Sequence, residues 1–299
     1  MRAGAVLAIL AIAGAGFVPL PSHAACEGVA PEARLQNSPR EDLGRDFDTI
    51  INDGWIEIAL YENFQPWSFE DAGKPAGIDV EIGALIAQSL GVAPRYRMVQ
   101  SGETLIEDLR NYVWKGAVID GHVSDLMIHA PYDVDFACTV DQVVFTGQYA
   151  TERLAIAYKP AEYPEKGPTP AFFRYDPVGV ENDSISDFYL SGVAHGVTAD
   201  KVHRYKTTLA AMGGLDANEV MAVMGPRAEI EAGITPDIAV HEPGLLGLAK
   251  SKWTLGVAVS QQHRQLGYAV DDAIAAALED GRIAAIFQRY GVDFMPPVR

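Results

Sequence analysis

The sequence is poor in positive charge. Its 299 residues include 23 Lys and Arg against 40 Asp and Glu, a formal net charge of −17 at pH 7. This acid surplus argues against nucleic acid and anionic membrane as partners, because both repel a negatively charged protein. We interpret the surplus chiefly as a source of solubility; a basic protein partner is the alternative.

Long apolar runs are confined to the N-terminus. Arg2 precedes the apolar run "AVLAILAIAGAGFVPL", and "PSHAA" then supplies small residues, so residues 1–25 are typical of a cleaved secretory signal peptide. A lipid-anchored Cys26 is the alternative, but His23 stands where a lipid-attachment site favours an aliphatic residue. We therefore expect an exported, periplasmic protein with no membrane-spanning segment.

Cysteine is scarce: only Cys26 and Cys138 are present. An even pair in an oxidising compartment favours a disulfide, which would tie an N-terminal arm, residues 26–54, to the middle of the chain. Two free thiols are the alternative.

Strand and helix patterns alternate along the rest of the chain. A strand at 55–61, an amphipathic helix at 78–90 ended by Gly91, a strand at 95–100, a helix at 102–116 and a strand at 125–129 form one set. A second set runs from "RLAIAYKP" to "TLGVAVS", and an Ala-rich helical pair broken at Gly281 follows. This order predicts an α/β fold with right-handed βαβ units.

Two successive sets of this length predict two lobes. We assign residues 55–147 plus 259–299 to lobe 1 and residues 148–258 to lobe 2, with crossings at "FTGQYATE" and near Val257–Gln262. Side chains at the carboxyl ends of the strands should then line a cleft between the lobes.

The candidate cleft residues come from both lobes. The turn after the first strand offers aromatic and amide side chains, the third strand ends in "HAPYD", and the second lobe offers a helix start and a strand end: Tyr61, Phe64, Gln65, Trp67, His129, Tyr132, Asp133, Ser184 and Met224. Some have plainer interpretations. Phe64 and Trp67 could belong to a lobe core, Ser184 could be only a helix N-cap, and His129 and Asp133 could bond loop backbone.

Several chemical signatures are missing. The chain has no His-Glu-x-x-His, Gly-x-Ser-x-Gly or Ser-x-x-Lys motif, and Pro131 prevents a helix that would align His129 with Asp133. We therefore expect no metal, no cofactor and no catalysis. A catalytic pair of carboxylates is the alternative, because a chain with 40 acids readily brings two of them together.

Three segments carry a family resemblance: "ENFQPWSFEDAGKPAGIDVEIGALIAQSLGV", "TERLAIAYKP" and "WTLGVAVSQQHRQLGYAVDDAIAAALEDGRIAAIFQRYGV". Together they resemble the type 2 periplasmic solute-binding proteins, the amino-acid-binding family of ABC transporters, over most of residues 55–295. The resemblance implies a two-lobed binding protein with a ligand cleft.

The residues that hold amino acids in that family are absent. Its members place Thr-x-x-Arg after the third strand to clamp the ligand carboxylate, and an acid after a short second-lobe strand to hold the amine. Here those places read "HAPYD" and Met224-Gly225-Pro226. There is no arginine between Lys115 and Arg153, and no acid between Met224 and Glu229. We do not expect a free amino acid as the ligand.

The stretch "SDLMIHAPYD…QVVFTGQYATERLAIAYK" resembles a narrower group, the accessory J proteins of bacterial methanol oxidation, which are encoded with PQQ-dependent alcohol dehydrogenases. This implies a non-catalytic periplasmic accessory that docks to a PQQ alcohol dehydrogenase or assists its maturation, with no established small ligand. We expect its cleft or the cleft rim to recognise a peptide element of the partner, or to hold a small molecule. One alternative is a transporter receptor for a small polar or aromatic solute. The other is a dehydratase of the same fold, which would need a cationic clamp.

Overall fold

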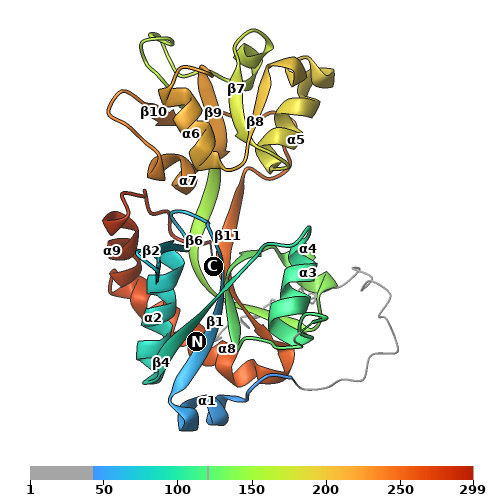
Figure 1. Ribbon diagram of the computed structural model, residues 1–299, viewed down its shortest axis with the longest axis vertical. Coiled ribbons are helices and arrows are strands. Elements are labelled where there is room, and N and C mark those ends of the chain that lie inside the picture. The colour runs from blue at the N-terminus through green and yellow to red at the C-terminus, as the bar shows by residue number, and fades with distance from the viewer. Residues whose placement is uncertain (1–42, 120, 299) are drawn as a thin grey trace, which may run out of the picture.

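The computed structural model describes residues 43–119 and 121–298, which form two α/β lobes stacked along the long axis of the molecule (Figure 1). The predicted signal peptide, Cys26 and most of the predicted arm lie outside the described residues.

Lobe 1 is built on the predicted βαβ units. Strand β1 (Trp55–Tyr61) pairs in parallel with both β4 (Ala93–Val99) and β5 (Leu126–Tyr132), and α2 (Ile78–Leu90) connects β1 to β4. The remaining elements of this lobe are α1 (Phe47–Asp53), β2 (Phe69–Asp71), β3 (Lys74–Ala76), α3 (Leu105–Leu109), the π-helical turn η1 (Arg110–Trp114), α4 (Val134–Thr139), η5 (Gln261–His263), α8 (Arg264–Glu279) and α9 (Arg282–Arg289). The chain leaves α2 through Gly91, whose φ of 70° lies in the region that glycine favours.

Lobe 2 repeats the α/β arrangement. Strand β7 (Val178–Glu181) pairs in parallel with β8 (Val202–Tyr205) and β9 (Ala222–Pro226). Its other elements are η2 (Pro170–Arg174), α5 (Ile185–Gly192), η3 (Val193–Gly196), η4 (Ala199–Lys201), α6 (Thr208–Asp216), α7 (Arg227–Ala232) and β10 (Ala239–His241).

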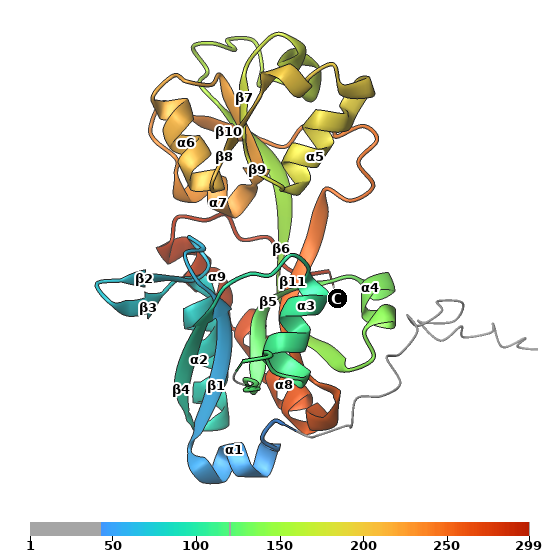
Figure 2. The same cartoon turned by 45° about the vertical axis from the view of Figure 1, so that its right-hand side comes forward.

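Two long strands connect the lobes: β6 (Val143–Tyr158) and β11 (Lys252–Ser260), which pair antiparallel (Figures 1 and 2). They make the sheet continuous in the order β4-β1-β5-β11-β6-β9-β7-β8, with β10 also paired to β6. Residues from Leu255 to Val259 pack in the lobe 1 core, whereas Trp253 contacts the cores of both lobes. The second crossing therefore lies earlier than the predicted Val257–Gln262.

Two local predictions differ from the structure. Strand β5 does not stop at His129 but continues to Tyr132, because β11 supplies an antiparallel partner for Ala130, Pro131 and Tyr132. The helix predicted over residues 102–116 is α-helical only over Leu105–Leu109 and then widens into η1.

Candidate functional site

His129 occupies a β-bulge where β5 pairs with the lobe 1 part of β11. Ile128 lies opposite Val257 and Ala130 lies opposite Gly256, so His129 is an extra residue of β5 with no partner on β11. Its φ of 67° lies in the left-handed region, which is uncommon for residues other than glycine. Backbone of this kind persists where its surroundings hold it in place and is frequent at functional sites.

A buried carboxylate fixes the imidazole. Nδ1 of His129 lies 2.9 Å from Oδ2 of Asp79, and the Tyr149 hydroxyl donates to Oδ1 of Asp79 at 2.7 Å. Asp79 lies in the first turn of α2 and is completely buried, as is Tyr149. Because a carboxylate only accepts, Nδ1 of His129 carries the proton of this bond. Burial, and then Asp79, raises the pKa of Tyr149, which therefore stays a donor. We call Asp79, His129 and Tyr149 the imidazole cluster.

Aromatic rings support the imidazole from the turn after β1. The rings of Trp67 and Phe64 lie 4.7 and 4.9 Å from that of His129, centre to centre. Trp67 is only 1% exposed and also packs on Phe287. It therefore holds His129 in place and presents almost no surface of its own, whereas Phe64 is half-buried and Gln65 is exposed.

One ring nitrogen of His129 is left unpaired. The residue is 9% exposed, and its side-chain hydrogen bonds to the described residues all involve Nδ1. Nε2 forms no hydrogen bond with the part of the chain that the structure describes. It is not completely buried, so it is accessible to solvent. An aspartate-backed imidazole with an accessible Nε2 can bond a ligand or exchange a proton with it.

Two buried acids lie on the lobe 2 side of the imidazole cluster, and Glu152 is near enough to His129 to interact with it. Glu152 on β6 accepts the backbone N–H groups of Arg153 at 2.7 Å and Ala228 at 3.4 Å, and is 4% exposed. Burial raises the pKa of Glu152 to about 7, and the hydrogen bond from Arg153 N–H and then the nearby His129 oppose that rise. Burial, and then Glu181 and Glu152, raises the pKa of Glu229 well above its usual range. We call Glu152 and Glu229 the acid pair.

Sequence reasoning missed Asp79 and the acid pair. Each acid lies inside an apolar pattern, at "GIDVEIG", "TERLAIAY" and "PRAEIEAG". An acid within an otherwise buried segment was the available signal, because an ionisable group is seldom buried without a partner.

The other predicted residues serve local structure. Tyr61 donates to Asp108 at 2.7 Å, Asp133 caps α4 by accepting from Phe136 N at 3.0 Å and also pairs with Lys250, and Ser184 caps α5 by accepting from Asp187 N at 3.2 Å. Tyr132 packs on Phe145, and Met224 is completely buried in the lobe 2 core. The structure thus gathers Phe64, Trp67 and His129 together and places Met224 inside its lobe.

A second polar cluster ties the lobes together through ion pairs. Arg153 pairs with Glu242 and Asp293, and Arg227 pairs with Glu231, Glu242 and Asp293. These five residues form the hinge ion cluster. Beside it, Thr151 bonds the carbonyls of Met295 and Pro296 at 2.9 and 2.8 Å, so the C-terminal segment lies along β6.

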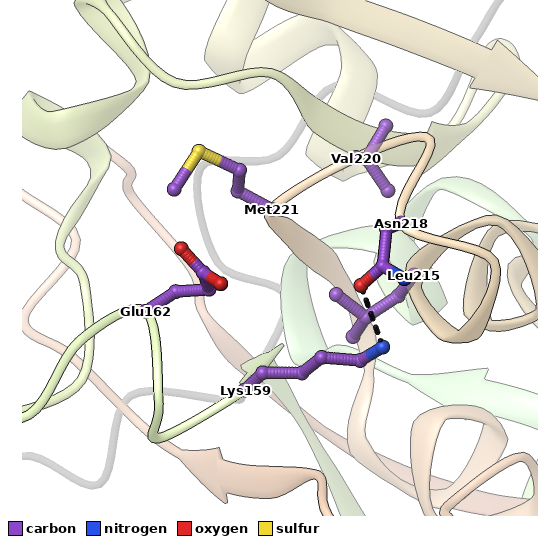
Figure 3. A pocket seen from close by; sticks show the side chains of 6 residues that line it. All are labelled: Lys159, Glu162, Leu215, Asn218, Val220 and Met221. Carbon is purple, nitrogen blue, oxygen red and sulfur yellow. Dashed lines mark hydrogen bonds between the residues drawn. The ribbon is translucent and has the colours of Figure 1, made fainter.

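Two hollows lie away from the imidazole cluster. One of about 210 Å³, where β6 ends beside α6 and β9, is lined by Lys159, Glu162, Leu215, Asn218, Val220 and Met221; Lys159 donates to Asn218 at 2.8 Å (Figure 3). The other, about 530 Å³, lies between α7 and the segment from α9 onward, lined by Glu231, Ile234, Ala284, Gln288, Gly291, Val292, Asp293 and Phe294. None of the predicted cleft residues lines either hollow.

Residues 43–119 and 121–298 contain no group of three His, Cys, Asp or Glu side chains arranged to hold a metal ion. Within the same residues, no helix is both long and apolar enough to span a membrane. The predicted Cys26–Cys138 disulfide joins a residue outside the described part to Cys138 of α4, and it stays a prediction.

Comparisons with known proteins support the fold. The family model "Bacterial extracellular solute-binding proteins, family 3" matches residues 56–120. An ancestral cationic amino acid solute-binding protein superposes with a TM-score of 0.67 at 15% identity, over 82% of this chain and 98% of its own. An arginine-binding protein mutant from T. maritima gives 0.57 at 21%, over 81% and 97%.

The L-cysteine solute receptor of Neisseria gonorrhoeae gives a TM-score of 0.58 at 20% identity, over 82% of this chain and 93% of its own. No curated protein matches the sequence. At these identities the likeness establishes the two-lobed type 2 periplasmic binding-protein fold predicted from the sequence, and that alone.

Proposed function

We propose that the protein is a periplasmic solute receptor that holds a small molecule between its lobes, with His129 as the central contact. The observation that carries this proposal is the accessible Nε2 of a histidine held on a bulge by a buried aspartate. Holding a left-handed histidine in one orientation costs folding free energy, which a ligand contact would explain. The solute receptors among the structural neighbours support the same type of function.

The ligand we propose differs from a free amino acid. The end of β5 carries His129 and Asp133 where the amino-acid binders keep an arginine, and Asp133 is engaged by Phe136 N and Lys250. No guanidinium from this stretch is available as a carboxylate clamp, because residues 116–152 contain no arginine.

Native mass spectrometry tests the receptor proposal. The protein is incubated with a small-molecule extract, and retained compounds are ranked by titration and by the rise in Tm. We expect His129→Asn to lose the retained compound, because asparagine tolerates a left-handed φ while removing the imidazole. Gln65→Ala, at an exposed position of the neighbouring turn, is the matched control. Failure of the wild-type protein to retain any compound would contradict the proposal.

A second candidate is the accessory role at a PQQ alcohol dehydrogenase. It is favoured by the stretch His129–Asp133, which forms the second half of β5 and the cap of α4. Immobilised protein should then capture a PQQ alcohol dehydrogenase from a periplasmic extract, and a variant with Tyr132 and Asp133 changed to alanine should not. Solute retention without such capture would favour the receptor over the accessory.

We propose binding without catalysis. In support, one structural neighbour, a precursor of cyclohexadienyl dehydratase, is an ancestral amino-acid-binding protein. An Asp–His pair close to a buried glutamate could nevertheless transfer protons, so recovery of retained compounds unchanged is the required control. Conversion of a retained compound by wild-type protein, and not by His129→Asn, would overturn this part of the proposal.

A further inference from the structure

His129 presents an acceptor that no donor of the described residues occupies. Its Nδ1–H is used by Asp79, so in the neutral imidazole the accessible Nε2 presents a lone pair. His129 is about nine-tenths buried, and a polar atom in such a place is normally paired. A ligand that donates a hydrogen bond would complete this arrangement.

Glu152 and the two glutamates that interact with it or with each other, Glu181 and Glu229, have acceptor positions that no donor uses. Glu152 receives two backbone N–H groups, whereas a carboxylate has about four acceptor positions. Glu181 receives the N–H and the hydroxyl of Thr208 on a single oxygen, Oε2. Glu229 also interacts with the Thr208 hydroxyl and with both other glutamates. The three acids are therefore near enough to interact, and none of them forms an ion pair with a lysine or arginine of the described residues.

The neighbouring basic side chains have other partners. Arg153, next to Glu152, turns its guanidinium to Glu242 and Asp293. Arg227, at the start of the helix that carries Glu229, pairs with Glu231, Glu242 and Asp293. Lys206, two residues before Thr208, is exposed. None of these three basic side chains forms an ion pair with Glu152, although the charge of Arg153 acts on it and opposes the rise of its pKa.

We infer that the molecule held between the lobes is an organic amine that lacks a carboxylate, bound as its cation by Nε2 of His129 and the carboxylate of Glu152. This inference rests on the proposed receptor function and narrows it to one chemical class. An ammonium group offers three donors and one positive charge, which matches the lone pair of His129 and the open acceptor positions of Glu152. A carboxylate would instead meet Glu152, Glu229 and Glu181.

The inference predicts a link between binding and protons. Glu152 faces His129 and Tyr149 of the imidazole cluster, its neighbour Arg153 and Glu229 on α7. Because its pKa is raised to about 7, an ammonium ligand must displace a proton from Glu152 at lower pH. Amine affinity should accordingly fall about tenfold between pH 8 and pH 6, through this one group.

Matched probes on two carbon skeletons test the chemical class. Isothermal titration with the full mature protein compares putrescine, butanediol and succinate on an aliphatic skeleton, and phenethylamine, phenylethanol and phenylacetate on an aromatic one. We expect the amine to bind at least about tenfold more tightly than its alcohol and acid counterparts on at least one skeleton. Tighter binding of a carboxylate, or no binding of either amine, would overturn the inference.

Two variants locate the contacts. Glu152→Gln should weaken amine binding about tenfold at pH 8 and remove its pH dependence, while Glu165→Gln, which removes an exposed charge of lobe 2, should leave both unchanged. If alcohols or acids bind and His129→Asn abolishes that binding, the receptor proposal survives and the amine inference falls. If no compound binds in the titrations or in the native spectra, both fall.

Discussion

Two polar clusters contact β6, one through Tyr149 and the other through Arg153, and they differ in how complete they are. In the hinge ion cluster two arginines share three carboxylates, and each of the five side chains has a partner of opposite charge. The imidazole cluster and the acid pair are more deeply buried, hold several carboxylates and leave Nε2 of His129 open. The first cluster is complete as protein alone, which suits a structural connection. In the second, no lysine or arginine of the described residues forms an ion pair and Nε2 of His129 has no donor, which suits a binding site.

The largest expected effect comes from removing the carboxylate that fixes His129. Asp79→Ala should lower the free energy of unfolding by about 3 kcal/mol, because the imidazole N–H and the Tyr149 hydroxyl lose their buried acceptor. Urea unfolding measures the change, with Asp237→Ala at an exposed position as the control. A loss below about 1 kcal/mol would show that the imidazole cluster does not depend on this residue.

The acid pair should make stability depend on pH. The pKa of Glu152 rises from 4.5 to about 7 on folding, so its contribution is fully present below pH 4.5 and is lost as the pH rises to 7. The free energy of unfolding of Glu152→Gln, relative to that of wild type, should therefore rise by up to about 3 kcal/mol between pH 4.5 and pH 7. Urea unfolding across this range measures the difference, and Glu165→Gln should run parallel to wild type. A constant difference would contradict the raised pKa.

The bulge can be tested apart from the imidazole. His129→Gly and His129→Ala remove the same ring contacts, but alanine keeps the penalty of a left-handed φ. We expect the glycine variant to be more stable by about 1 kcal/mol in urea unfolding. Equal stability of the two variants would mean that β5 can lose its extra residue when the ring is gone.

The smallest effect belongs to the hinge ion cluster. The side chain of Asp293 is 56% exposed, and the arginines that it contacts keep Glu242 as a partner. Asp293→Asn should cost less than about 1 kcal/mol, and salt should reduce that cost further. A larger loss of stability that persists in high salt would mean that the hinge ion cluster, like the imidazole cluster, depends on a buried interaction.

The sequence predicted the elements of the fold better than their contacts. Alternating patterns identified the main strands and helices of lobe 1 and β6, β7, β9 and β11, but not β8, α6 or β10 of lobe 2. Gly91 marked the end of α2, and Ser184 proved to be the N-cap of α5. These features are local, because a helix period, a cap or a left-handed glycine is encoded within a few residues.

The site could be predicted only in part, because its contacts join distant segments. His129 was a candidate from the unusual end of its strand, but Asp79 looked like an ordinary acid in the first turn of a helix. The bulge depends on the register of β11, and the burial of Trp67 depends on Phe287 of α9. Neither contact can be predicted from the residues of a single segment.

The path of the C-terminal segment has a practical consequence. Met295 and Pro296 are bonded to Thr151 on β6, so the end of the described chain lies beside the crossing strands (Figure 2). Val298 is 78% exposed there. A fluorophore attached through Val298→Cys would report any change in the angle between the lobes without occupying the site. A bulky C-terminal affinity tag would instead lie close to the strands that connect the lobes.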